Sequence, residues 1–361
     1  MRTPLSLLRP FPAWTIALCA ALLASGCATT PGERKEVAPT TMVEPGSVLR
    51  SLALDRAVED RLLALDPEHI SENDVRTTLS LVPAPQILLI HGGVYGTHLV
   101  MATFARFLVD MGYPEAKIRD PADREYSYSP YGDSWNSAGA IAWYYEHSGV
   151  RPMLIGHSQG GIQAIKILYE LVGSYRNKIA VWNPVTDVAE ERFSITDPLT
   201  GAERPVVGGV SVSYASVVGA GGAALLLPNQ WSMIRRLHSI PDSVEDFTGF
   251  AIYVDMLAWD FGTADKEQYR PNGTAHVRNV ILPLTYNHVF IPLTERVKDD
   301  QRMRDWVNAY VPGADNPEPP GLTEGKAYNA LWTADVWFSV KKHWCLEAQK
   351  LVRAKRALRN E

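Results

Sequence analysis

A serine framed by glycines separates two apolar segments near the middle of this 361-residue chain. Residues 152–155 (PMLI) form a short apolar run typical of a buried parallel strand, and apolar residues recur at helical spacing over residues 162–172. The intervening residues 156–160 read Gly-His-Ser-Gln-Gly. Very small residues two places before and after the serine allow strand and helix to pass close together at a sharp turn. The pattern therefore predicts a strand–turn–helix unit with Ser158 at its apex and the Gln159 N–H at the start of the helix.

The segments around this unit alternate between strand-like and helix-like patterns. Short apolar runs bounded by glycine or proline predict buried strands, and longer amphipathic stretches predict helices. The expected strands are 86–90, 152–155, 179–182, 210–218, 249–254 and 277–283, and the expected helices are 49–65, 99–111, 137–147, 162–172 and much of the C-terminal 70 or so residues. This alternation predicts an α/β fold with a mostly parallel central sheet and helices on both faces. Residues 190–209 read as a polar hairpin-like excursion, and the region of about 190–250 as an inserted lid or cap.

Composition and charge restrict the class of protein. The chain is 46% hydrophobic and 21% charged, which suits a large globular domain over residues 49–361. The formal net charge is −5, and no stripe of basic residues interleaved with aromatic ones is present in the sequence. A nucleic acid is therefore not an expected partner.

The N-terminus has the pattern of a targeting segment. Arg2 and Arg9 precede a short apolar run at residues 14–23, which is too short for a comfortable membrane span. Small residues and then Cys27 follow, and this arrangement resembles the signal peptide of bacterial lipoproteins, although Ala24 stands where that pattern usually has leucine.

The lipoprotein resemblance divides the N-terminal region into two parts. It implies a signal peptide at residues 1–26, and a lipidated Cys27 that begins a tether over residues 27–48. Ala28 after the cysteine implies delivery to the outer membrane, with the body facing the periplasm or the cell surface. Cys345 would then be the one free thiol of the mature chain, so we expect a packed thiol and no intramolecular disulfide.

A second motif follows the first predicted strand. Residues 91–93 read His-Gly-Gly, well before Ser158. A buried strand followed by His-Gly, and a later strand–Gly-x-Ser-x-Gly–helix unit, resemble the α/β-hydrolase superfamily in its serine lipase and esterase branch. The resemblance covers roughly residues 85–300. It implies that the backbone N–H groups of Gly93 and Gln159 form an oxyanion hole, with His91 orienting the loop.

The same resemblance places the catalytic groups along the chain in the order serine, acid, histidine. His288 follows a β-branched run and a short loop, as the catalytic histidine of serine lipases does, so it is the expected general base. His276 precedes that run, and His238 lies in an irregular region. His343 is expected on the surface of a helix, beside lysines.

The acid that orients the histidine is open among three aspartates. Asp255 directly follows the apolar residues 249–254 and is the first choice. Asp246 and Asp260 lie in the same part of the chain and remain alternatives.

Together these features predict a serine hydrolase that cleaves carboxylic esters through an acyl-enzyme, with no cofactor or metal. Apolar residues in the region 220–261 favour a lipidic or hydrophobic ester. An acyltransferase or thioesterase on the same fold is an alternative, and so is a non-catalytic envelope lipoprotein that binds lipid or a protein partner. Residues 219–224 (GAGGAA) also fit a dinucleotide-binding pattern, but Pro228 would interrupt the helix that this pattern requires.

Overall fold

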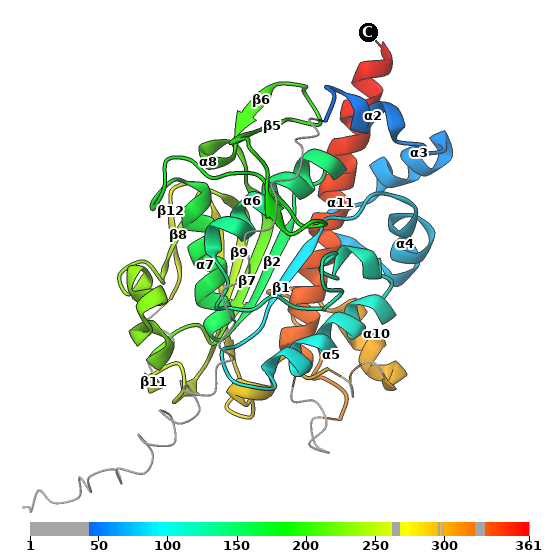
Figure 1. Cartoon of the computed structure of the whole chain (residues 1–361). Helices are drawn as coiled ribbons and strands as arrows, with labels where there is room; N and C mark the ends of the chain where they lie inside the picture. Colours follow the sequence, from blue (N-terminus) through cyan, green and yellow to red (C-terminus); the bar gives the residue numbers. More distant parts are fainter. Residues whose placement is uncertain (1–42, 262–267, 295–296, 298, 322–328, 361) are drawn as a thin grey trace, which may run out of the picture.

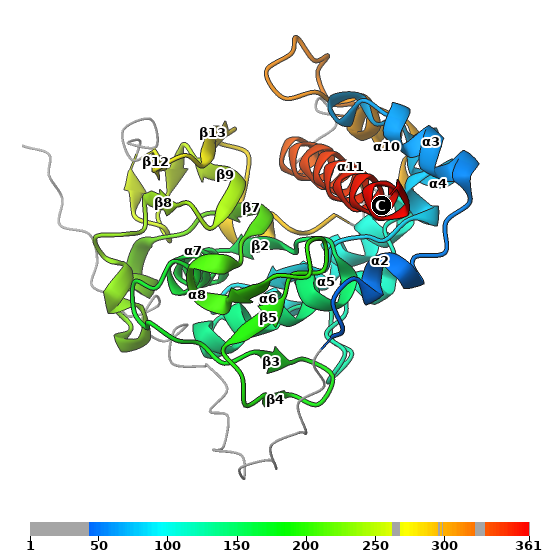
Figure 2. The ribbon, with the colours of Figure 1, turned by 90° about the horizontal axis from the view of Figure 1, so that it is seen from above.

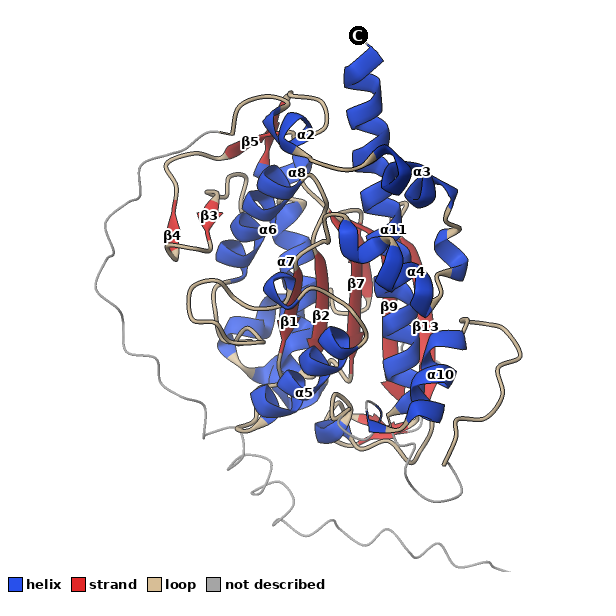
Figure 3. Cartoon of the chain, turned by 90° about the vertical axis from the view of Figure 1, so that its right-hand side faces the viewer, coloured by secondary structure: helices blue, strands red, loops and turns tan. Residues whose placement is uncertain are grey.

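A computed structural model describes residues 43–261, 268–294, 297, 299–321 and 329–360. Its centre is a five-stranded sheet in which all neighbouring strands are parallel. The strands lie side by side (Figure 3) in the order β1 (Ile87–Ile90), β2 (Met153–His157), β7 (Val212–Val218), β9 (Val244–Ile252) and β13 (His276–Leu282). Because all five strands run the same way, the loops that follow them gather at one edge of the sheet. The predicted α/β fold is confirmed.

Helices cover both faces of this sheet (Figures 1 and 2). One face is covered by α6 (Ser134–Ser148) and α7 (Gln159–Leu171), and the other by α5 (Thr97–Asp110), α10 (Gln301–Ala309) and α11 (Ala330–Asn360). Three short N-terminal helices lie on the α11 side: α2 (Ser47–Ser51), α3 (Arg56–Ala64) and α4 (Glu72–Thr77). Among the described helices, none combines the length and the apolar character that a membrane span requires.

Each central strand supplies two hydrophobic cores, because side chains alternate across a strand. Ile87 and Leu89 pack into the core beneath α5 and α11, whereas Leu88 and Ile90 pack into the core beneath α6 and α7. All four side chains are buried. The uninterrupted apolar run that predicted this strand is therefore what a strand covered on both faces requires.

The remaining strands form two-stranded pairs outside the central sheet. They are β3 (Trp182–Asn183) with β4 (Val188–Ala189), β5 (Ser194–Thr196) with β6 (Glu203–Pro205), β8 (Ser239–Pro241) with β12 (Arg270–Asn272), and β10 (Val254–Asp255) with β11 (Asp260–Phe261). The short helix α8 (Val206–Gly209) follows β6. The β5–β6 hairpin lies within residues 190–209, where the sequence predicted a hairpin-like excursion.

Three predictions about the organisation of the chain need correction. Ile179 and Val181 are buried, but Val181 bonds to the backbone of residues 190 and 192 and not to β2, so the next strand of the sheet after β2 is β7. The region 190–250 is not one insertion, because it contains β7 and most of β9. The expected helix 49–65 is broken in two, since the Asp55 side chain accepts from Ala57 N and begins a new helix, α3.

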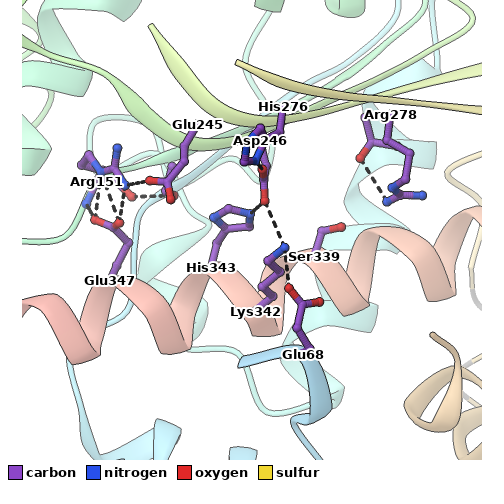
Figure 4. Close-up of polar contacts among 12 residues, drawn as sticks. Glu68, Arg151, Glu245, Asp246, His276, Arg278, Ser339, Lys342, His343 and Glu347 are labelled. Carbon is purple, nitrogen blue, oxygen red and sulfur yellow. Dashed lines mark hydrogen bonds and ion pairs between the residues drawn. The ribbon is translucent and has the colours of Figure 1, made fainter. Parts of the chain in front are cut away.

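Charged side chains connect helix α11 to the first halves of β9 and β13 (Figure 4). Arg278 on β13 donates to both carboxylate oxygens of Asp335, each at 2.6 Å. About three turns further along α11, Glu347 accepts from Arg151 at 2.6 Å. Bidentate pairs of this kind fix both distance and orientation, so they determine where α11 lies on the sheet.

His343 on α11 also faces the sheet, so its predicted position on the surface of the helix is wrong. Only 1% of His343 is exposed, and its Nε2 lies 2.9 Å from Asp246 on β9. Lys342 Nζ lies 3.2 Å from the same carboxylate, and His276 Nδ1 lies 3.1 Å from it (Figure 4). The neighbouring lysines suggested an exposed helix face, but α11 presents this face to the sheet.

Candidate active site

The structure places Ser158 on the turn between β2 and α7. Its backbone has φ 56° and ψ −124°, a strained conformation for a residue with a side chain. The Ser158 N–H donates to the carbonyl of Val218 on β7 at 2.8 Å, which fixes the turn against the sheet. A Cβ at Gly156 would lie 2.5 Å from the carbonyl oxygen of Gly160, and a Cβ at Gly160 would lie 2.2 Å from that of Ile90. Both glycines are therefore sterically required.

His288 connects Ser158 to a carboxylate. It begins a short 3-10 turn (His288–Phe290) after β13, and its Nε2 lies 2.8 Å from Ser158 Oγ. Its Nδ1 lies 2.6 Å from Asp255 Oδ2. The second carboxylate oxygen of Asp255 accepts the N–H groups of Leu257 and Ala258 at 3.1 and 3.0 Å. Because Nδ1–H is donated to Asp255, Nε2 is the nitrogen that can accept the serine proton.

Asp255 is the candidate acid that the structure brings to His288. Its side chain is buried, as a carboxylate paired with an imidazole can be. Asp246 contacts two other histidines, at the opposite end of β9. Asp260 pairs with Asp255 through the backbone of the β10–β11 hairpin, and its side chain lies outside the described set. The remaining candidate histidine, His238, packs edge-on against Tyr269.

Gly93 and Gln159, whose N–H groups the sequence predicted to form an oxyanion hole, both line the cavity beside Ser158. Gln159 is the first residue of α7, so its N–H has no acceptor within the helix. The carbonyl of Gly92 accepts from the Thr97 hydroxyl at 2.7 Å, and because the peptide bond is trans, the Gly93 N–H points the opposite way. A Cβ at Gly93 would lie 1.9 Å from Gln159 Oε1. Glycine at position 93 therefore allows this loop to approach the start of α7.

His157, which the sequence analysis did not single out, supports the position of His288. It is completely buried at the end of β2, and its Nε2–H donates to the backbone carbonyl of His288 at 2.6 Å. Burial, reinforced by the nearby His288, lowers the pKa of His157 to about 3. A neutral His157 therefore holds the loop that carries His288. The signal in the sequence was its place between Gly156 and Ser158, where a buried strand ends.

Gly219, one of the small residues 219–224 that follow β7, also shapes the site. It follows β7 with φ +62°, and a Cβ there would lie 2.9 Å from the His288 ring and 3.3 Å from Asp255 Oδ2. Glycine at this position thus makes room for the aspartate–histidine pair. The segment 219–224 continues into a short 3-10 helix (Gly222–Leu226), not the long helix of a dinucleotide-binding motif.

A cavity of about 290 Å³ lies beside Ser158. Loops that follow β1, β7, β9 and β13 line it together with the start of α7. Its apolar lining includes Val94, Ala224, Met256, Leu257 and Trp259, and the described lining contains no lysine, arginine, aspartate or glutamate. The space next to the serine is therefore suited to an uncharged, apolar group.

No protein-family model matches this chain, and no curated protein shows significant similarity to it. Among the described residues, no group of three histidine, cysteine, aspartate or glutamate side chains is arranged to hold a metal ion. The site consists of a serine hydroxyl in contact with a histidine, which in turn contacts a buried carboxylate. It lies at the C-terminal edge of a parallel α/β sheet.

Proposed function

We propose that this protein is a serine hydrolase of the α/β-hydrolase type that cleaves carboxylic esters with hydrophobic groups. The observation that carries the proposal is the chain of contacts from Ser158 Oγ through His288 to Asp255. The apolar cavity beside Ser158 supports a hydrophobic acyl or alkyl group in the substrate.

The proposed reaction has two stages. Ser158 Oγ attacks the ester carbonyl carbon while His288 Nε2 takes the hydroxyl proton, and the Gly93 and Gln159 N–H groups donate to the resulting oxyanion. His288 gives the proton to the leaving oxygen, so an alcohol departs and the acyl group stays on Ser158. A water molecule then gives a proton to His288 and adds to the acyl carbon. His288 returns the proton to Ser158 Oγ, and the carboxylic acid leaves. Asp255 stabilises the imidazolium in both stages.

Replacement of the nucleophile is the direct test. Ser158→Ala should lower kcat on p-nitrophenyl esters by about four to six orders of magnitude, because it removes the attacking oxygen. Its melting temperature should match that of wild type. Ser51→Ala, on the exposed surface of α2, is the matched control and should retain full activity. A series of esters of rising acyl length should show a preference for apolar chains; equal turnover by Ser158→Ala and wild type would refute the proposal.

Related functions on the same site give different outcomes. Fluorophosphonate labels an activated serine, because Oγ displaces fluoride from phosphorus. A non-catalytic lipid-binding protein would remain unlabelled, as Ser158→Ala should. An acyltransferase would convert the ester to a new ester when a second alcohol is supplied, whereas a hydrolase releases the free acid.

We further propose that a lipid on Cys27 holds the protein at the outer membrane. Residues 1–42 lie outside the described residues, so the support is the lipoprotein-like sequence alone. Cys27→Ser should leave the precursor uncleaved and unlipidated, as measured by mass spectrometry of the N-terminal peptide. A wild-type protein with an unmodified mature N-terminus at another residue would contradict this anchor.

A further inference from the structure

The surface around the Ser158 cavity carries most of the exposed large apolar side chains of the described molecule. We name the four segments 91–99, 219–234, 253–261 and 283–294 the apolar rim; they follow β1, β7, β9 and β13. The apolar rim holds thirteen of the twenty large apolar side chains that are exposed in the described residues. Scattered apolar residues are normal on a protein surface, but apolar residues gathered in one place mark an interaction surface.

The four segments of the rim meet at one place. Each contributes to the lining of the cavity beside Ser158, through Val94, Ala223, Met256 and Val289 respectively. Further out, large side chains from the same segments face solvent. Tyr95 is 75% exposed, Trp231 60% and Leu284 66%. The apolar surface therefore surrounds the mouth of the proposed active site.

The rim is also nearly free of charge. Its four segments contain two charged residues, Asp255 and Asp260, and Asp255 is buried against His288. The outer part of a protein–protein interface is normally polar. An apolar and uncharged surface instead matches the boundary between lipid headgroups and acyl chains.

We propose that the apolar rim docks onto a lipid surface and that the Ser158 cavity takes its ester directly from that surface. This inference rests on the proposed ester hydrolysis and names how its substrate is presented. Docking places the cavity mouth against the acyl region, so a hydrophobic ester enters the cavity without crossing water. The side chains of the rim lose contact with water in the same step, which favours the docked state.

The proposed anchor has the length that such docking requires. Helix α2 lies at the top of Figure 1 and β11, part of the rim, lies at the bottom. The chain between Cys27 and Ser47 spans up to about 65–70 Å when fully extended. A folded body of this size is about 50 Å across. The tether is therefore long enough for the rim to face the same membrane that holds Cys27.

Paired substitutions test the role of the rim in catalysis. The rim variant combines Leu99→Ser, Leu226→Ser and Leu284→Ser, all more than half exposed and none lining the cavity. The control variant combines Leu81→Ser, Val185→Ser and Phe193→Ser, which are exposed to a similar extent outside the rim. With a long-chain p-nitrophenyl ester dispersed in phosphatidylcholine vesicles, the rim variant should raise the apparent KM at least tenfold. Its kcat/KM on soluble p-nitrophenyl butyrate should equal that of wild type, and the control variant should match wild type on both.

Docking is measured without catalysis in mature Ser158→Ala protein, which lacks Trp14 of the signal segment. Trp231 and Trp259 on the rim are exposed, so phosphatidylcholine vesicles brominated along the acyl chains should quench part of the tryptophan fluorescence. Quenching should persist at 0.5 M salt, since the rim is nearly uncharged, and the Leu99, Leu226 and Leu284 substitutions should abolish it.

The outcomes separate docking from hydrolysis. If the rim variant has the same apparent KM on vesicles and the same tryptophan quenching as wild type, the docking proposal is wrong. Light scattering distinguishes a third outcome. If wild type is a dimer that vesicles do not quench, and the rim variant is a monomer, then the rim binds a second copy of the chain. Quenching in proteins that turn over no ester would leave docking standing and overturn the proposed hydrolase.

Discussion

Two aspartate–histidine pairs lie at opposite ends of β9, and their surroundings differ. Asp255 follows the strand and binds His288, whose other ring nitrogen contacts Ser158. Asp246, near the start of the strand, binds His343, whose Nδ1 makes no hydrogen bond to the described residues. The six residues of β9 that follow Asp246 span about 20 Å at about 3.3 Å each, so the two aspartates lie far apart. The same two residue types therefore form a serine–histidine–aspartate arrangement only where a serine lies within hydrogen-bond distance of the histidine.

The electrostatic settings of the two pairs also differ. Around Asp246, burial raises the carboxyl pKa, but hydrogen bonds from His343 and the charge of Lys342 outweigh it and hold the pKa well below its usual range. A cavity of about 330 Å³ beneath α11 is lined there by charges of both signs, including Glu68 and Arg278. The cavity beside Ser158 is apolar. One end of the strand is built to hold α11 in place, and the other to admit an uncharged molecule.

Among the substitutions that compare the two pairs, the largest expected effect is the loss of activity at Asp255. Asp255→Asn should lower kcat by about 10³–10⁴-fold, because the amide no longer selects the Nδ1–H tautomer or stabilises the imidazolium. The folded protein should remain soluble, with a melting temperature close to that of wild type. Asp246→Asn serves as the matched control and should retain wild-type kcat on a soluble ester. If Asp255→Asn and Asp246→Asn lost kcat equally, the two aspartate–histidine pairs would not differ in function.

For stability we expect the opposite order, with a larger loss in Asp246→Asn than in Asp255→Asn. Asp246→Asn should lower the free energy of unfolding by about 2–4 kcal/mol, because it leaves the buried His343 and the half-buried Lys342 without this carboxylate. Urea denaturation followed by circular dichroism measures this change. Asp60→Asn, at an exposed ion pair with Arg356, should lower the free energy of unfolding much less, because water screens this pair. A loss no larger than that of Asp60→Asn would show that the Asp246 cluster does not hold α11 in place.

The buried His157, near Ser158 and His288, predicts that stability depends on pH. Its pKa is about 3 in the folded state and about 6.5 in the unfolded chain, so between these values the unfolded state binds the extra proton. This contribution to stability is complete above pH 6.5 and falls by up to about 1.4 kcal/mol per pH unit as the pH drops.

The matching variant is His157→Asn, which keeps a donor near the His288 carbonyl but does not titrate. Urea unfolding between pH 7 and pH 5 should show a shallower loss of stability in His157→Asn than in wild type. Parallel pH profiles would mean that His157 takes up its proton in the folded state as well.

The smallest expected effect concerns backbone strain. Ser158→Gly should be about 1 kcal/mol more stable than Ser158→Ala, because glycine adopts φ 56° without a Cβ penalty. Ser339→Gly in α11 should change stability in the opposite direction, by about 0.5 kcal/mol, since glycine weakens a helix interior. Thermal unfolding of Ser158→Gly, Ser158→Ala and Ser339→Gly measures whether each change raises or lowers stability. A Ser158→Gly protein less stable than Ser158→Ala would show that no strain is stored at the turn.

The sequence by itself determined the parts of the site that depend on neighbouring residues. Gly156 and Gly160 are required by atoms within the same strand–turn–helix unit, or by the strand beside it, so the pattern alone placed Ser158 and the Gln159 N–H. Uninterrupted apolar runs likewise predicted strands covered on both faces. These are short-range steric and burial constraints, and each acts within a short stretch of chain. His288 was predicted on another ground, the resemblance of its strand–loop–histidine order to that of serine lipases.

The tertiary structure decided what depends on which segments meet. Asp246 and Asp255 both adjoin β-type runs, and their local sequences do not show which one contacts a histidine 33 residues beyond Asp255. The burial of His343 followed from the face that α11 turns to the sheet, and the support of His288 by His157 followed from a contact across 131 residues. Such contacts depend on the register of the strands and the paths of the loops between them, so they became visible only when the chain had been folded.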